Sequence, residues 1–216
     1  MLSALDALGR LRDGNARFAS GVRSIETLMS QTRRADFVER QQPFAVILGC
    51  SDSRVPVEIV FDQGLGDLFV IRVAGNVAAP SQVGSVEFAA DQFGVQLVVV
   101  LGHTFCSAVD AAISELSRPT GAQSPLLHAI VDRIRPSVEG LLETELVNDP
   151  KALAQQAIRS NVRMSASALR HGSQLIERMV DAGELLILGA EYSLETGCVE
   201  LFDGLPPAEV DGSPAT

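Results

Sequence analysis

Four near-continuous apolar runs, separated by longer amphipathic stretches, constrain the fold of this chain most. Strands that are covered on both faces appear as continuous apolar runs, whereas strands with one solvated face alternate. The segment 198–202 does alternate, with Glu200 between apolar neighbours, and a hairpin-like turn precedes it. It therefore predicts an antiparallel edge strand. The four continuous runs are Phe44–Gly49, Leu68–Val73, Gln96–Leu101 and Leu185–Gly189.

Helical patterns fill the intervals between these strands, and such alternation is typical of an α/β protein with a parallel sheet. We predict a single α/β domain over residues 1–205, with a mostly parallel four-stranded sheet, one antiparallel edge strand and flanking helices. A loose tail at 206–216 follows it. The predicted helices cover residues 2–18, 81–93 behind a serine cap, 107–116, 124–145 with a break before Pro136, and 149–182.

The composition excludes several kinds of partner. The net charge of −10 opposes binding to nucleic acids and to anionic lipid surfaces. No apolar run approaches the ~20 residues of a membrane span, and the N-terminal segment lacks the continuous apolar core of a secretory signal. We therefore expect a cytoplasmic protein without nucleic-acid or membrane partners. The three cysteines argue against a disulfide framework and leave metal binding or catalysis open.

Residues with metal-binding side chains follow two of the predicted strands. Cys50 ends the first strand, and the third is followed by His103 and Cys106. Because the carboxyl ends of parallel strands lie at one sheet edge, the three can converge there. Two thiolates and an imidazole suit Zn²⁺ and leave a fourth position open. Each residue taken alone would more often be a packing residue. We expect Cys198 to be a buried thiol in the core, and His128 and His171 to be surface or packing residues.

An acid and a base, Asp52 and Arg54, come directly after Cys50. A carboxylate beside a metal can accept a hydrogen bond from bound water, or it can coordinate the metal itself as a fourth ligand. A guanidinium two residues away can hold that carboxylate bidentately and keep it off the metal. The alternative is an ordinary surface ion pair, worth ~0–1 kcal/mol.

The sequence CSDSRVP at 50–56, followed by GHTFC at 102–106, resembles the signature pair of the β-class carbonic anhydrases. The segment 64–76 fits that family as well, and the likeness extends from residue 11 to about residue 201. The resemblance implies hydration of CO₂ to bicarbonate in an obligate homodimer, sometimes a homotetramer, in which the N-terminal helix (residues 1–20) reaches over the partner. It also implies Zn²⁺ on Cys50, His103 and Cys106, a water-orienting dyad of Asp52 and Arg54, and substrate contacts from Gln41, Phe69 and Ser107.

Two positions depart from the family pattern. Ser107 stands where glycine is usual; it retains the backbone N–H, but its hydroxymethyl group could crowd the substrate pocket or bind bicarbonate. Ile47 stands where a bicarbonate-inhibited subgroup has tryptophan, although Arg72 and Tyr192 match other anchors of that subgroup. We therefore expect the regulatory bicarbonate site to be absent or weak, so that it does not lock Asp52 onto the metal.

Three other functions are compatible with the same residues. A related zinc hydrolase would act on CS₂ or COS. A non-catalytic module that responds to bicarbonate would bind zinc without turning over CO₂, and Ser107 is the feature that leans that way. A purely structural zinc domain would show a fourth protein ligand.

Overall fold

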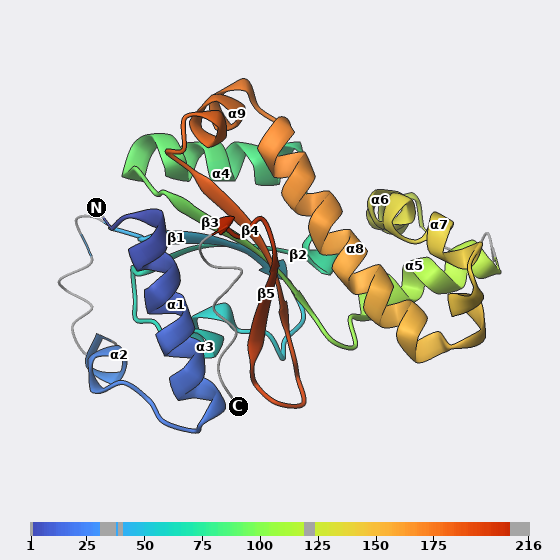
Figure 1. The fold of residues 1–216 in the computed structure, drawn as a ribbon, viewed down its shortest axis with the longest axis horizontal. Coiled ribbons are helices and arrows are strands. Elements are labelled where there is room, and N and C mark those ends of the chain that lie inside the picture. The colour runs from blue at the N-terminus through green and yellow to red at the C-terminus, as the bar shows by residue number, and fades with distance from the viewer. Residues whose placement is uncertain (1, 31–37, 39–40, 119–123, 208–216) are drawn as a thin grey trace.

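The computed structural model describes residues 2–30, 38, 41–118 and 124–207, which form a twisted five-stranded sheet packed between helices (Figure 1). The strand order is β2-β1-β3-β4-β5. The first four strands in this order are parallel, and β5 is antiparallel to β4. The predicted fold class and the antiparallel edge strand are therefore confirmed. The strands are β1 (Ala45–Cys50), β2 (Leu68–Val73), β3 (Leu97–His103), β4 (Leu186–Tyr192) and β5 (Val199–Asp203).

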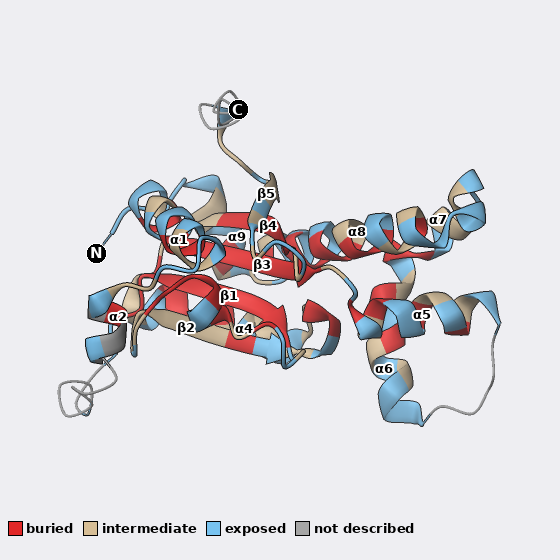
Figure 2. Cartoon of the chain, turned by 90° about the horizontal axis from the view of Figure 1, so that it is seen from below, coloured by how far each residue is buried: buried red, intermediate tan, exposed pale blue. Residues whose placement is uncertain are grey.

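The register of the sheet brings the chemistry-bearing residues to one edge. Gly49 of β1 pairs with Leu101 of β3, so both Cys50 and His103 lie at the carboxyl ends of neighbouring strands. Every residue of β1 and β3 is buried, which explains why both segments are almost purely apolar (Figure 2).

Alternate strand residues pack against helices on opposite faces of the sheet. Helices α1 (Ala4–Ala19) and α3 (Val57–Val60) cover the face that carries Ile47, Val99 and Leu101. On the other face, Val46 and Val98 are among the residues that pack against three further helices. Those helices are α4 (Pro80–Phe93), α8 (Pro150–His171) and α9 (Gln174–Asp181).

A third apolar cluster lies beyond the carboxyl edge of the sheet and encloses Cys50 and Cys106. Its helices lie together on the right of Figure 1, against the N-terminal half of α8. The chain reaches this cluster from β2 through the short 3₁₀ turn η2 (Ala74–Asn76). The other elements around it are α5 (Ser107–Ser117), α6 (Pro125–Ile134), η3 (Arg135–Ser137), α7 (Glu139–Leu142) and η4 (Glu145–Asn148).

The helices predicted over 2–18, 81–93 and 107–116 are confirmed as α1, α4 and α5, with boundaries within two residues, but the chain has more helical segments than predicted. The predicted break before Pro136 is present, because α6 ends at Ile134. The single helix predicted over 149–182 is wrong: α8 ends at His171, and Ser173 caps a separate α9 by accepting hydrogen bonds from its first backbone N–H groups. The predicted serine cap of α4 is also wrong, because Ala79 occupies the cap and Pro80 begins the helix.

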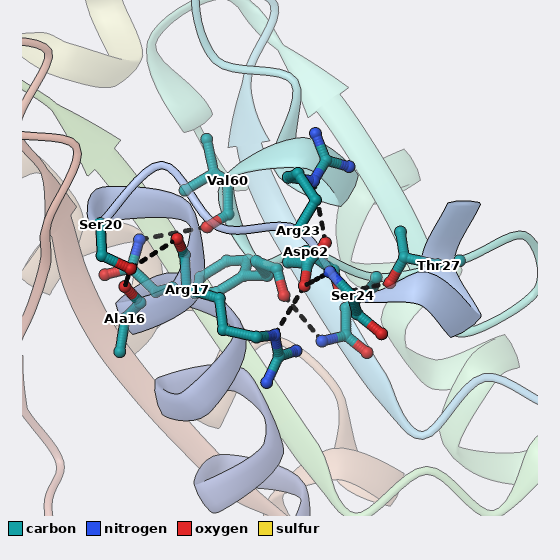
Figure 3. Close-up of polar contacts among 12 residues, drawn as sticks. Ala16, Arg17, Ser20, Arg23, Ser24, Thr27, Val60 and Asp62 are labelled. Atoms are coloured by element: carbon teal, nitrogen blue, oxygen red, sulfur yellow. Dashed lines mark hydrogen bonds and ion pairs between the residues drawn. The ribbon is translucent and has the colours of Figure 1, made fainter.

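The helix α2 (Ile25–Ser30) and α3 were not predicted, and one buried carboxylate ties the segments that contain them together (Figure 3). The Asp62 side chain accepts hydrogen bonds from Arg17 Nε at 2.7 Å, Arg23 Nε at 2.9 Å and the Ser24 backbone N–H at 3.0 Å. The Thr27 hydroxyl donates to the Asp62 carbonyl at 2.9 Å. Asp62 thus fixes α1 and the segment that contains α2 to the end of α3.

No described helix has the length and apolar content that crossing a membrane requires. Most of the predicted tail, residues 208–216, lies outside the described residues.

Candidate metal centre

Three buried side chains from two strand ends converge at the carboxyl edge of the sheet. The ligand atoms of Cys50, His103 and Cys106 all lie within 4.8 Å of one another. Cys50 is the last residue of β1 and His103 the last of β3. Phe105 has a left-handed backbone with φ +58° and lies in the turn that connects His103 to Cys106, the residue preceding α5.

The hydrogen bonds around these donors leave one nitrogen available. His103 Nδ1 lies 2.9 Å from the Thr104 carbonyl oxygen, so this nitrogen carries the proton and donates. His103 Nε2 is fully buried and has no hydrogen-bond partner among the described residues. A buried, unpaired imidazole nitrogen facing two sulfurs is costly unless a cation occupies the space between them. The donor set and this nitrogen therefore fit a tetrahedral N/S-preferring metal.

The electrostatics of the two thiols agree with a cation site. A hydrogen bond from Cys106 lowers the pKa of Cys50, and that same bond, together with burial, raises the pKa of Cys106. Burial disfavours the charged imidazole of His103, but the neighbouring Cys50 sulfur, the Thr104 carbonyl and the Asp52 carboxylate together outweigh this and raise the pKa of His103. The protein alone therefore stabilises one thiolate, and a second thiolate requires a positive charge between the two sulfurs.

Asp52 and Arg54 form a bidentate pair at the rim of the donor set. Arg54 Nε donates to Asp52 Oδ1 at 3.0 Å, and Arg54 Nη2 donates to Oδ2 at 2.7 Å. The same Nη2 also donates to the carbonyl oxygen of Phe105 at 3.1 Å. The hydrogen bonds from Arg54 hold the pKa of Asp52 well below its usual range. Asp52 Oδ2 is 3.9 Å from His103 Nε2, so an ionised carboxylate lies beside the donors while its oxygens are engaged by arginine.

The Arg72 side chain supports the same loop by donating to its backbone carbonyl groups. Its Nε donates to the Cys50 carbonyl at 3.1 Å and its Nη2 to the Asp52 carbonyl at 2.6 Å. An arginine within an otherwise apolar strand was the sequence signal for this role. Ile47 is fully buried in the core and Tyr192 is 5% exposed, so both pack in the interior.

The predicted substrate residues lie in two different places. Ser107 is the exposed first residue of α5, directly after Cys106. Gln41 precedes β1 and lines a cavity of about 770 Å³ with Phe44 and Phe93, at the opposite end of that strand from Cys50. Phe69 lies near the start of β2, where its ring packs against Phe93 with centroids 6.0 Å apart. A single chain therefore does not bring Gln41 or Phe69 to the metal-binding side chains.

The prediction that Cys198 is a core thiol is wrong, because the residue is exposed. It precedes the edge strand β5 and shares exposure with Glu200, two residues further on. The two-residue period of a strand was the signal that could have revealed this. His128 is half-buried and His171 exposed, as predicted. Sequence reasoning missed Gly75, whose backbone N–H donates to Cys50 Sγ at 3.3 Å.

Comparison with known proteins agrees with this geometry. The carbonic anhydrase family model matches residues 45–199. A carbonic anhydrase of Mycolicibacterium smegmatis is 40% identical over 191 residues, which cover 88% of this chain and 89% of that protein. Carbonic anhydrase 2 of Mycobacterium tuberculosis is 38% identical over 193 residues, which cover 89% and 90%. The structure of the β-carbonic anhydrase CcaA superposes with a TM-score of 0.74 at 24% identity, covering 92% of this chain and 89% of that one.

The parallel sheet with two cysteines and a histidine at its carboxyl edge defines an α/β protein with a candidate metal centre. The family model and the mycobacterial relatives, which match over most of their length, show which family this protein belongs to. The chain belongs to the carbonic anhydrase family, and it has the fold of a β-class carbonic anhydrase.

Proposed function

We propose that this protein catalyses the reversible hydration of CO₂ to bicarbonate and a proton, with Zn²⁺ held by Cys50, His103 and Cys106. The observation that carries the proposal is the convergence of these three donors beside the Asp52 carboxylate, which Arg54 holds in place with two hydrogen bonds. The relatives that share most of the chain bear the name carbonic anhydrase. Among the described residues, no fourth His, Cys, Asp or Glu joins this group, which disfavours a purely structural zinc domain.

A bound zinc ion would supply a Lewis acid that makes water a nucleophile near neutral pH, for which the three-histidine carbonic anhydrases are the standard example. The protein's own residues would do the rest. The two thiolates and the imidazole would hold the ion, and the thiolates would cancel its charge. Asp52 accepts a hydrogen bond from the attacking water and so directs it toward CO₂. Arg54 keeps Asp52 ionised and engages both of its oxygens, so the carboxylate would stay off a bound metal.

The substrate pocket is proposed to require a second copy of the chain. Gln41 precedes β1 and Phe69 lies near the start of β2, at the opposite end of these strands from Cys50, so they would contact CO₂ in the partner's site rather than in their own. This implies a homodimer, with residues 1–20 reaching the partner through exposed side chains such as Leu5, which is 52% exposed. A homotetramer is the larger alternative; two β-carbonic anhydrases of Sordaria macrospora, similar in fold with a TM-score of 0.72, are described as tetrameric. We propose the cytoplasm as its location.

A non-catalytic module that responds to bicarbonate is the second candidate, and Ser107 is the observation that favours it. The backbone N–H groups at the start of a helix are free of intrahelical partners, and Ser107 is the first residue of α5. A substrate oxygen placed there would meet both the Ser107 N–H and the added hydroxymethyl group. The same argument applies to a CS₂ or COS hydrolase, in which the altered pocket would admit a different substrate.

The test combines metal analysis with three substrates. The purified chain should contain about one zinc per subunit, and its stopped-flow rate of CO₂ hydration should far exceed that of the same protein stripped by a chelator. Turnover of COS or CS₂ without CO₂ hydration would favour the hydrolase. Zinc binding without turnover of any of the three would favour the non-catalytic module.

A further inference from the structure

We propose that Asn161 of α8 is a positioning residue for the metal centre: it fixes the Gly75 segment, whose backbone N–H donates to the sulfur of Cys50. The proposal rests on the metal site of the proposed function. It concerns a residue 86 positions from Gly75 in the sequence, on a helix that supplies none of the three donors.

Two hydrogen bonds connect Asn161 to the sulfur. Asn161 Nδ2 donates to the Gly75 carbonyl oxygen at 2.7 Å, and the Gly75 N–H donates to Cys50 Sγ at 3.3 Å. The two bonds engage the two peptide groups on either side of the Gly75 Cα atom. Glycine rotates more freely about that atom than any other residue, so the bond from Asn161 restricts the rotation that would turn the N–H away from sulfur.

A side chain at Gly75 would be strained. Its φ of +68° lies in the left-handed region, and a Cβ atom would lie 2.8 Å from Ile134 Cδ1 and 3.3 Å from the Ala108 Cβ atom. Glycine therefore gives this part of the backbone more intrinsic freedom to rotate than another residue would. The hydrogen bond from Asn161 adds to the packing that holds the turn in place.

The asparagine comes at a cost that packing alone does not explain. Asn161 is 1% exposed, and its Oδ1 has no hydrogen-bond partner within the described ranges. Its neighbours in the helix include the buried residues Ile158 and Val162. A buried amide with an unpaired oxygen is destabilising, whereas leucine would fill a similar volume without that cost. The donor to Gly75 is what distinguishes asparagine from leucine at this position.

An N–H donor to sulfur stabilises the thiolate and fixes its direction toward the other two donors. Partners of metal ligands typically change metal affinity by about 10- to 100-fold when they are removed. We therefore expect Asn161 to act on metal affinity and on the electronic structure of the metal–sulfur bond. A residue that only filled the core would act on folding stability instead.

The experiment uses three variants of the full chain. Asn161→Leu removes the donor at similar volume, and Asn161→Ala removes the whole amide without adding bulk or charge. Ser165→Ala is the matched control, because Ser165 is buried one turn further along the same helix, at 4% exposure. Zinc affinity is measured by competition with a chelator. The sulfur-to-metal charge-transfer band is recorded on the Co²⁺-loaded protein, and the melting temperature is measured on the metal-free protein.

The proposal predicts that both Asn161 variants bind zinc about 10- to 100-fold more weakly and shift the charge-transfer band, while Ser165→Ala leaves both unchanged. If Asn161→Leu does not fold, Asn161→Ala decides. Zinc affinity within twofold of the wild type would overturn the proposal, as would an equal loss in Ser165→Ala. A wild-type chain that binds no zinc would overturn both proposals, whereas one that binds zinc without hydrating CO₂ would overturn only the proposed function.

Discussion

Asp62 offers the sharpest test of how the N-terminal helices are held to the sheet. Its side chain is fully buried and faces the guanidinium groups of Arg17 and Arg23 (Figure 3). Asp62→Asn is the cleanest perturbation, because Asp62 has φ +46° and asparagine tolerates the left-handed region almost as well as aspartate does. The substitution retains one acceptor oxygen but places an NH₂ group against a guanidinium.

The expected loss of stability in Asp62→Asn depends on how deeply Asp62 and its two arginine partners are buried. Removing one member of a fully buried ion pair costs about 3–5 kcal/mol. Here the arginine side chains are 36% and 33% exposed, so water can partly replace the lost carboxylate. We therefore expect Asp62→Asn to lower the free energy of unfolding by about 2–3 kcal/mol at neutral pH. Asp132→Asn is the control, since that carboxylate is 58% exposed in its pair with Arg135, and it should cost less than ~1 kcal/mol.

The assay is urea unfolding of both variants at fixed protein concentration and several pH values. Burial opposes ionisation of Asp62, but the hydrogen bonds from Arg17 and Arg23 outweigh it and lower its pKa. A lowered pKa contributes stability above the unfolded-state pKa of about 3.9 and loses it as pH falls through the folded-state pKa. The gap between wild type and Asp62→Asn should thus be constant near neutrality and shrink in acid. A gap no larger than that of Asp132→Asn, or one that persists in strong acid, would refute the reasoning.

Three further predictions concern the site. Ser107→Gly should raise kcat/KM for CO₂ by at most about tenfold, which lowers the activation free energy by at most ~1.4 kcal/mol, with zinc content unchanged. A fall in kcat/KM would mean that the Ser107 hydroxyl assists the reaction. Bicarbonate should inhibit only by competing as the product, because Ile47 is buried in the core and Arg72 is bonded to backbone carbonyls; bicarbonate found near Arg72 with Asp52 on zinc would contradict this. Activity should rise through alkaline pH, because two thiolates weaken the acidifying effect of zinc, and a flat profile between about pH 6 and pH 9 would count against it.

The sheet could be predicted from the sequence because each buried strand appears as an apolar run that stops at a glycine or a polar residue. The convergence of Cys50 and His103 followed from the same reasoning, since strand ends in a parallel sheet share one edge. The break between α8 and α9 could not be predicted in this way. Gly172 lies between segments that both favour helix, and a single glycine within a helical pattern is tolerated at a cost of only about 1 kcal/mol.

The residues that support the site depend on contacts that no local pattern contains. The bond from Asn161 to Gly75 joins a helix to a distant turn, and neither segment's periodicity marks it. The roles of Gln41 and Phe69 were inferred from family resemblance and not from any pattern in the sequence. One chain places both residues away from Cys50. Their proposed roles therefore depend on the proposed dimer.

Stopped-flow CO₂ hydration by the zinc-loaded protein at about pH 8.5, beside Asp52→Asn, tests the central claim most directly. Asp52 is the carboxylate that Arg54 holds next to His103, and the amide cannot accept the hydrogen bond as a charged base would. The account predicts fast turnover by the wild type and by the distant control Asp132→Asn, and a loss of about 10²-fold or more in Asp52→Asn with zinc still bound. Equal rates in wild type and Asp52→Asn, or no hydration by either, would contradict it.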